Sequence, residues 1–268
     1  MAVPDFLAGA LNTDFRYFSR AGVTDVNTII SDLNTELIAL GWTDASGVGT
    51  GPFKTPTRAD GAFIVLTLAR TSAVRLSLVV TDPAGMVVTP AAGLEVDIDA
   101  GGTEIRLYTG KFHVCIDSAR VTPEAFYCAI LDRSPEELAL PRPIYVCSYG
   151  PRSNLGAITN QSWCSHYGIP VDGVAYAACN GTSSWVVERG IVAAGLNRLT
   201  VSGALMPVPF EFGKDGWLMG RMPQALIIDG GQVYGTEITV PLDTGVTGIF
   251  KVAGFSADAS GKLMFRKA

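Results

Sequence analysis

The strongest candidates for chemistry in this chain are His113, Cys115 and Asp117, which alternate along the apolar segment Phe112–Asp117. On a β-strand these three side chains share one face, because successive side chains point to opposite sides. A thiol beside an imidazole and a carboxylate resembles a cysteine nucleophile with its base. Same-face neighbours two residues apart lie about 6.5–7 Å apart along a strand, which exceeds the hydrogen-bonding reach that such a pair needs. We therefore interpret the segment as a half-buried strand and predict no catalytic residue.

A metal site is the second chemistry that the residue types allow. Cys164 and His166 lie close together, and Cys147 and Cys179 are near them in the sequence. Structural zinc sites usually contain closely paired ligands such as C-x2-C, and this spacing is missing here. We expect no metal, no cofactor and buried structural cysteines. The odd number of cysteines and a start without the pattern of a signal peptide favour free thiols made in a reducing compartment.

Two pairs of acids and one glycine-rich segment have structural explanations. Glu136 and Glu137 follow Ser134 and Pro135, and acids in the first turn of a helix are favoured by its dipole. Asp97 and Asp99 precede a Gly-Gly turn. The stretch Thr43–Pro56 has the composition of a loop, and its glycines lack the lysine of a phosphate-binding loop.

The composition limits the classes of partner. The chain has 268 residues, of which 48% are hydrophobic and only 17% are charged, against roughly 25% charged in an ordinary soluble domain. Surface with so little charge is typically covered by partners. The net charge of -5 argues against a protein that binds the phosphate backbone of nucleic acids. Because no run reaches about 18 apolar residues, we expect no membrane span.

Short apolar segments separated by Gly and Pro turns predict a mainly β protein with one or more β-sandwich-like domains. The expected strands are Ala62–Leu68, Arg75–Val80, Met86–Val88, Glu104–Tyr108, Phe112–Ile116 and Phe126–Ile130, and a final pair lies at Ile238–Leu242 and Gly248–Ala253.

One N-terminal helix is predicted between a cap at Thr24 or Asp25 and a stop at Gly41. Its apolar residues recur at helical spacing and form one stripe, which contains Val26, Ile29, Ile30, Leu33, Leu37 and Leu40. We expect this stripe to pack against the strand Ala62–Leu68, because each has an apolar face that must be covered.

The organisation predicted along the chain has three parts. Residues 1–23 form an extended N-terminal arm without regular structure, residues 24–142 form the helix and a β-sandwich-like domain, and residues 143–268 form a second β-rich, loop-rich region. The arm is the candidate for assembly contacts, because its apolar residues must be buried somewhere and chain termini are free to reach outward. The alternative is an arm that lies across the sheet of its own subunit. The candidate contact residues are Phe6, Leu7, Leu11, Phe15, Tyr17 and Phe18. A short helix is expected at Ser134–Leu138, and Asn180-Gly181 predicts a hairpin.

Several short sequence segments, spread across roughly residues 25–155, resemble virion structural proteins of tailed bacteriophages. They are Gly41-Trp42-Thr43, Phe53-Lys54-Thr55-Pro56, Asp60-Gly61-Ala62-Phe63, Arg70-Thr71-Ser72, Phe112-His113, Asp117-Ser118-Ala119-Arg120-Val121-Thr122-Pro123-Glu124 and Tyr149-Gly150-Pro151-Arg152. The resemblance implies a building block of the neck, collar or tail that is made in the host cytoplasm and resides in the virion. It also implies a ring-forming homo-oligomer with other virion proteins as partners.

Two alternatives remain beside this non-enzymatic structural role. One is a carbohydrate- or receptor-binding β module of a host-attachment apparatus, which would stack sugars on Trp163, Tyr167, Trp185 or Trp217. The other is a small hydrolase with a Cys or Asp centre. Packing of the aromatic residues in a core or interface is the ordinary explanation for them.

Overall fold

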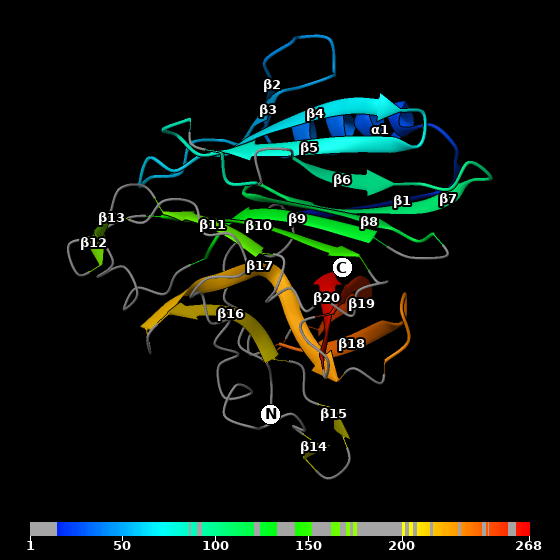
Figure 1. Cartoon of the computed structure of the whole chain (residues 1–268). Coiled ribbons are helices and arrows are strands. Elements are labelled where there is room, and N and C mark those ends of the chain that lie inside the picture. Colours follow the sequence, from blue (N-terminus) through cyan, green and yellow to red (C-terminus); the bar gives the residue numbers. More distant parts are fainter. Residues whose placement is uncertain are drawn as a thin grey trace.

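The protein is mainly β, with three antiparallel sheets stacked in layers and a single helix among the described residues (Figure 1). The computed structural model describes residues 15–85, 87–89, 93–120, 124–132, 143–151, 162–166, 170–171, 174–175, 200–201, 204–205, 208–214, 217–229, 232–242, 245, 247–256 and 261–268. The β-sandwich-like fold with one N-terminal helix packed on a sheet is confirmed.

The middle layer, called the central sheet, has both faces covered. Its strands in spatial order are β1 (Phe15–Val23), β7 (Thr103–Gly110), β8 (His113–Ser118), β9 (Glu124–Ile130), β10 (Ile144–Pro151) and β11 (Ser162–His166). Every residue of β8 is buried. Val114 and Ile116 belong to the core on one face, and Cys115 belongs to the core on the other. Covering both faces explains why this part of the sequence reads as nearly continuous apolar runs.

The second layer, called the upper sheet, covers one face of the central sheet. It contains β2 (Thr43–Asp44), β3 (Phe53–Lys54), β4 (Val65–Ser72), β5 (Arg75–Thr81) and β6 (Leu94–Asp97). In β5, Leu76, Leu78 and Val80 are buried and the residues between them are not. This alternation of period two places one apolar face toward the central sheet.

Helix α1 (Val26–Ala39) packs against β4 and β2 of the upper sheet and against β1 and β7 of the central sheet. Asp25 caps it, because its carboxylate accepts the N–H of Asn27 at 2.8 Å and satisfies a donor that the first turn leaves free. Gly41 follows the last turn with φ of +85°, a left-handed conformation that costs glycine little. The predicted cap, stop and apolar stripe are confirmed, and the stripe shares one core with Leu66 of β4.

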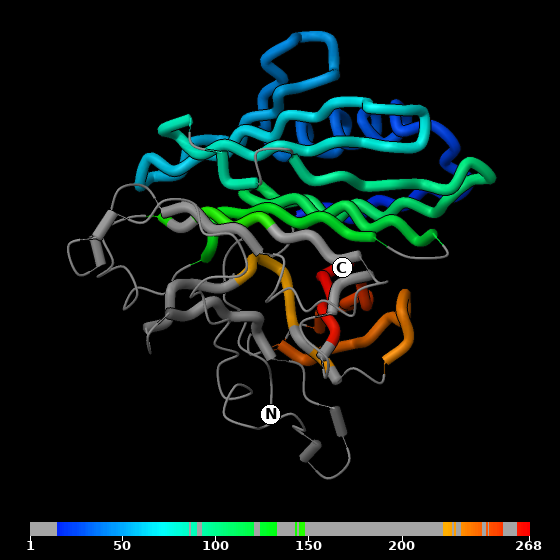
Figure 2. The backbone as a smooth tube through the Cα atoms, in the orientation of Figure 1, coloured from blue at the N-terminus to red at the C-terminus, as the bar shows by residue number. Residues whose placement is uncertain are grey.

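The third layer, called the C-terminal sheet, covers the opposite face of the central sheet (Figure 2). Its strands in spatial order are β16 (Val208–Lys214), β17 (Trp217–Asp229), β20 (Gly261–Arg266), β19 (Thr247–Ser256) and β18 (Glu237–Pro241). Two short hairpins complete the described strands, β12 (Pro170–Val171) with β13 (Val174–Ala175) and β14 (Thr200–Val201) with β15 (Ala204–Leu205).

Five aromatic rings form a row through the interface between the central and C-terminal sheets. Tyr17 lies 5.1 Å from Tyr108 between ring centroids, Tyr108 lies 5.4 Å from Phe265, and Phe265 lies 5.3 Å from Tyr127. The ring of His113 follows at 6.2 Å from Tyr127. These separations are in the range of favourable aromatic pairs, so the row ties strands of both sheets into one core.

Three expectations need correction. Phe15–Val23 is a regular strand rather than an irregular arm. The segment Thr43–Pro56 is not wholly a loop, because β2 and β3 pair within it. The strand Gly248–Ala253 does not close the sequence, because β20 follows and inserts between β19 and β17.

The expected boundary at 142/143 falls between β9 and β10, which are adjacent strands of the central sheet. The central sheet therefore draws strands from all three expected parts of the chain. The expected helix at Ser134–Leu138 and the hairpin turn at Asn180-Gly181 lie outside the described residues.

Candidate functional site

His113, Cys115 and Asp117 share one face of β8, as predicted, but that face lies beneath the C-terminal sheet rather than at a surface. Burial lowers the pKa of His113 to about 3, so the imidazole is neutral. Burial, with a further contribution from the charge of Asp117, raises the pKa of the Cys115 thiol well above its usual range. A reactive cysteine needs a stabilised thiolate and access, and this environment supplies neither.

The described cysteines are core residues. Cys115, Cys128 and Cys147 are buried free thiols, and burial raises the pKa of Cys128 as well. The side chains of Cys164, His166 and Cys179 lie outside the described residues. Within the described part of the chain, no three His, Cys, Asp or Glu side chains gather as metal ligands would. The absence of metals and cofactors stays a prediction.

The acid pair Asp97 and Asp99 belongs to a cluster of ion pairs rather than to a cleft. Asp97 contacts Arg75 at 2.8 Å and Arg120 at 3.4 Å, and Asp99 lies 3.5 Å from Arg120. The backbone N–H of Asp97 donates to the carboxylate of Glu124, at 2.9 Å. The side chain of Glu124 in the central sheet thus binds one backbone N–H of the edge strand β6, so this group is not free to pair with another chain.

The glycine-rich loop Asp44–Gly51 is ordered by its own aspartate. The carboxylate of Asp44 accepts backbone N–H groups from Ser46 at 3.0 Å, Gly49 at 2.5 Å and Gly51 at 3.0 Å. A ring of N–H groups of this kind can bind an anion. Here the carboxylate of Asp44 already fills that position, so the loop is not a phosphate site.

The candidate assembly residues fall into two groups. Phe6, Leu7 and Leu11 lie outside the described residues. Phe15, Tyr17 and Phe18 lie on β1, and each is half-buried. β1 pairs with β7 of the same chain and forms one outer edge of the central sheet.

One face of β1 contacts cations of the C-terminal sheet. Arg266 lies 4.8 Å from the ring centroid of Phe15. Lys267 and Lys251 lie 5.4 Å and 5.7 Å from the ring centroid of Tyr17, and Lys251 also donates to the Tyr17 hydroxyl at 3.3 Å. Cations placed over aromatic faces are attracted to them. Contacts with β19 and with the C-terminal residues Arg266 and Lys267 therefore hold β1 in place.

The opposite face of β1 contacts α1. Arg16 pairs with the buried Glu36 at 2.5 Å, and Arg20 binds both carboxylate oxygens of Asp32 at 2.7 Å. Phe18 packs against the core that α1 shares with the two sheets. β1 is therefore held on both faces by its own chain, and among the described strands only β7 pairs with its backbone.

The alternative of a carbohydrate-binding surface rests on aromatic side chains that lie outside the described residues, namely Trp163, Tyr167, Trp185 and Trp217. The fourth tryptophan, Trp42, is buried, and its indole N–H donates to the Gly110 carbonyl at 2.9 Å. Trp42 therefore joins the start of β2 to the end of β7 and is a packing residue.

A second polar centre, which could not be predicted from the sequence, is assembled by the fold from Arg106, Asp117 and Tyr234. More than 100 residues separate Tyr234 from the other two. The only signal in the sequence was a charged residue within the apolar strand Glu104–Tyr108.

No family model matches the chain, and no curated protein matches it. No helix in the described part is both long and apolar enough to cross a membrane.

Proposed function

We propose that this protein is a structural component of a tailed-bacteriophage virion, in the neck, collar or tail, and that it acts by ring or particle assembly. Its partners are further copies of itself and other virion proteins. Phrases such as Asp117–Glu124, which resemble proteins of that class, support the proposal, and so does the β-sandwich-like fold.

The observation that carries the proposal is the position of β1. It is an outer strand of the central sheet, and both of its faces are fastened by its own chain. The apolar residues Phe6, Leu7 and Leu11 precede this strand directly in the sequence. A terminal segment attached to a fixed strand at the edge of a molecule is well placed to reach a neighbour.

Ring assembly also accounts for the low charge of the chain. A ring subunit contacts its neighbours through two different faces, in heterologous contacts that close on rotation. Such faces are covered in the assembly and tolerate apolar residues that an isolated subunit would expose. With 17% charged residues, the chain has the composition expected of such a subunit.

The proposal is tested by removing residues 2–14, which leaves β1 and its contacts intact. We expect the truncated chain to keep the unfolding midpoint of the full chain and to become monomeric, as measured by light scattering coupled to gel filtration. The full chain should form a defined multimer. A triple variant, Phe6→Ser with Leu7→Ser and Leu11→Ser, should behave like the truncation.

The matched control is Ile38→Ser, which changes an exposed apolar residue of α1 and should leave the multimer unchanged. A truncated chain that assembles normally would show that these residues are not the assembly device. A full chain that stays monodisperse and monomeric at high concentration would refute ring assembly.

A further inference from the structure

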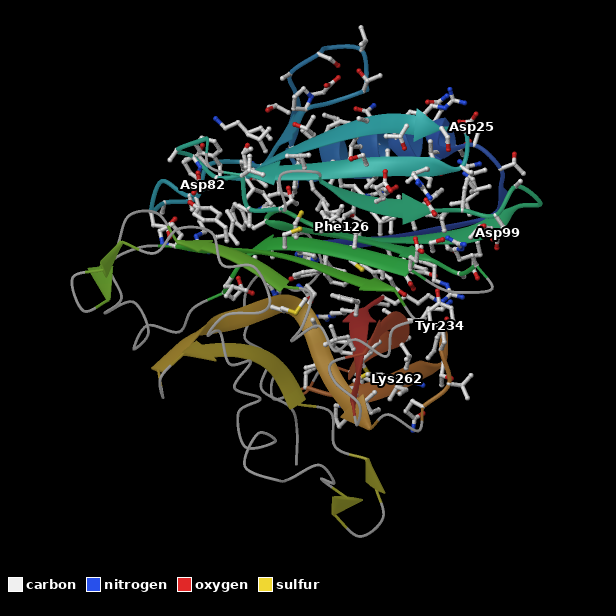
Figure 3. The ribbon with its side chains drawn as sticks, viewed as in Figure 1. Asp25, Asp82, Asp99, Phe126, Tyr234 and Lys262 are labelled. Atoms are coloured by element: carbon white, nitrogen blue, oxygen red, sulfur yellow. The ribbon has the colours of Figure 1, made fainter. Side chains whose placement is uncertain are left out.

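A polar centre lies between the central and C-terminal sheets, in an otherwise apolar interface. Arg106 and Tyr108 come from one face of β7, and Asp117 comes from β8, where it is the cross-strand partner of Arg106. Tyr234 comes from the segment that joins β17 to β18. Figure 3 shows Tyr234 beneath the central sheet, on the side of the C-terminal sheet. Asp117 and Tyr108 are 0% and 1% exposed.

Arg106 uses only part of its hydrogen-bonding capacity. Its Nε and Nη2 donate to the two carboxylate oxygens of Glu104, at 3.0 Å and 2.7 Å. Its Nη1 faces Asp117 Oδ2 at 3.7 Å, which is too long for a hydrogen bond. The guanidinium carbon lies 4.7 Å from the ring centroid of Tyr234, and a Cβ on Gly235 would approach both Nη1 and Nη2 to 3.2 Å.

Two buried polar atoms in this centre, Arg106 Nη1 and the hydroxyl oxygen of Tyr108, have no hydrogen-bond partner among the described residues. The hydroxyl of Tyr234 interacts with the carboxylate of Asp117. Burial and the nearby charge of Asp117 raise the pKa values of both tyrosines, so both hydroxyls keep their protons. A buried polar group without a hydrogen bond costs about 1–3 kcal/mol, and native proteins seldom tolerate several such groups together.

We infer that this centre is an internal hydration site, in which one or more bound water molecules bridge Arg106 Nη1, the hydroxyls of Tyr108 and Tyr234, and the carboxylate of Asp117. A buried water typically makes about three hydrogen bonds, and this set supplies donors and acceptors in that number. Arg106 donates, the carboxylate accepts, and each hydroxyl can do either.

The balance of charge selects a neutral occupant rather than an ion. The positive Arg106 faces the negative Glu104 and Asp117, and Arg106 and then Lys251 lower the pKa of Glu104. Lys251 also pairs with Glu237 at 3.5 Å, and Glu237 pairs with Lys267 at 2.7 Å. Three cations therefore offset three anions. Bound water would tie β7 and β8 to the β17–β18 connection, and this role does not depend on whether the protein assembles.

The inference is tested by asking whether removal of a tyrosine hydroxyl lowers or raises the stability of the protein. Tyr108→Phe and Tyr234→Phe keep both rings, including the ring under Arg106, and remove only the hydroxyls. If water satisfies the Tyr108 hydroxyl, Tyr108→Phe should lower the midpoint of urea unfolding. If that hydroxyl is simply buried and unsatisfied, Tyr108→Phe should raise the midpoint, and the inference is wrong.

Two direct measurements complete the test. Magnetic relaxation dispersion of the full chain should detect long-lived internal water, and the double variant Tyr108→Phe with Tyr234→Phe should lose part of that signal. A crystal structure at high resolution should show water within hydrogen-bonding distance of Arg106 Nη1. An unchanged signal in the double variant, or a monovalent cation at this position, would overturn the inference.

Discussion

Truncation of Leu33, a fully buried residue of α1, is predicted to lower the stability of the protein substantially. Its side chain is 0% exposed and lies in the core that α1 shares with the upper and central sheets. Leu33→Ala removes three buried carbon groups at about 0.8 kcal/mol each, or roughly 2.4 kcal/mol. A residual cavity of about 50 Å³ adds roughly 1.2 kcal/mol at about 24 cal/mol per Å³. The expected total is about 3–4 kcal/mol.

The assay is urea unfolding followed by far-UV circular dichroism and tryptophan fluorescence together, because coincident transitions justify a two-state treatment. With a slope of about 3 kcal/mol per molar urea for a chain of this size, the midpoint should fall by about 1 M or more. Ile38→Ala is the matched control, since Ile38 lies on the same helix and is 45% exposed. Its effect should stay within about 0.5 kcal/mol.

The result that would refute this reasoning is an unchanged midpoint for Leu33→Ala, or equal shifts for the two variants. Either outcome would mean that α1 does not depend on the packing described for it. A large shift in the control alone would show that the outer face of the helix is covered in solution.

Three further predictions concern the interior of the sandwich. Cys115 should resist a thiol reagent at pH 7.5 in the folded chain and react fully in urea, because burial raises its pKa; rapid labelling of the folded chain would contradict this. His113 has a pKa of about 3 when folded and about 6.5 when unfolded, so only the unfolded chain binds the proton between these values. The free energy of unfolding should therefore fall as the pH is lowered through this window, by up to about 1.4 kcal/mol per pH unit. Urea unfolding of the His113→Phe variant should show a shallower pH dependence. Equal slopes for the two proteins would contradict the burial of a neutral imidazole. Trp42→Phe should cost about 1–3 kcal/mol in the same assay, because it leaves the buried Gly110 carbonyl without its donor; an unchanged midpoint would show that this hydrogen bond contributes nothing.

Two elements with a one-sided apolar pattern, α1 and β5, could be predicted from the sequence. α1 has a cap, a single stripe and a glycine stop, and β5 alternates strictly, so each carries a complete local signal. One element that was missed, β20, is covered on both sides. In β20, Leu263 and Phe265 face one core while Met264 faces another, and this leaves a short apolar run without a period.

β1 was missed for a related reason. Side chains on both faces of β1 make contacts. Tyr17 contacts the core beneath the C-terminal sheet, and Phe18 packs against the core beside α1. The arginines of β1 pair with acids of the helix. The mixture of aromatic and charged residues therefore hides the strand.

For the candidate residues His113, Cys115 and Asp117, only their relation within one strand was predictable. The sequence placed His113, Cys115 and Asp117 on a common face because strand geometry fixes that relation. It could not supply the sheet that buries this face, or the contact of Asp117 with Arg106 and Tyr234, because these depend on the stacking of layers from distant parts of the chain.

The central proposal predicts that a tailed bacteriophage encodes this chain, and the protein composition of purified virions of that phage tests the proposal most directly. Quantitative mass spectrometry should find the chain in intact particles at a fixed copy number that matches a symmetric ring. Intact, infectious particles that lack the chain, while it accumulates free in the lysate, would contradict a structural role in the virion.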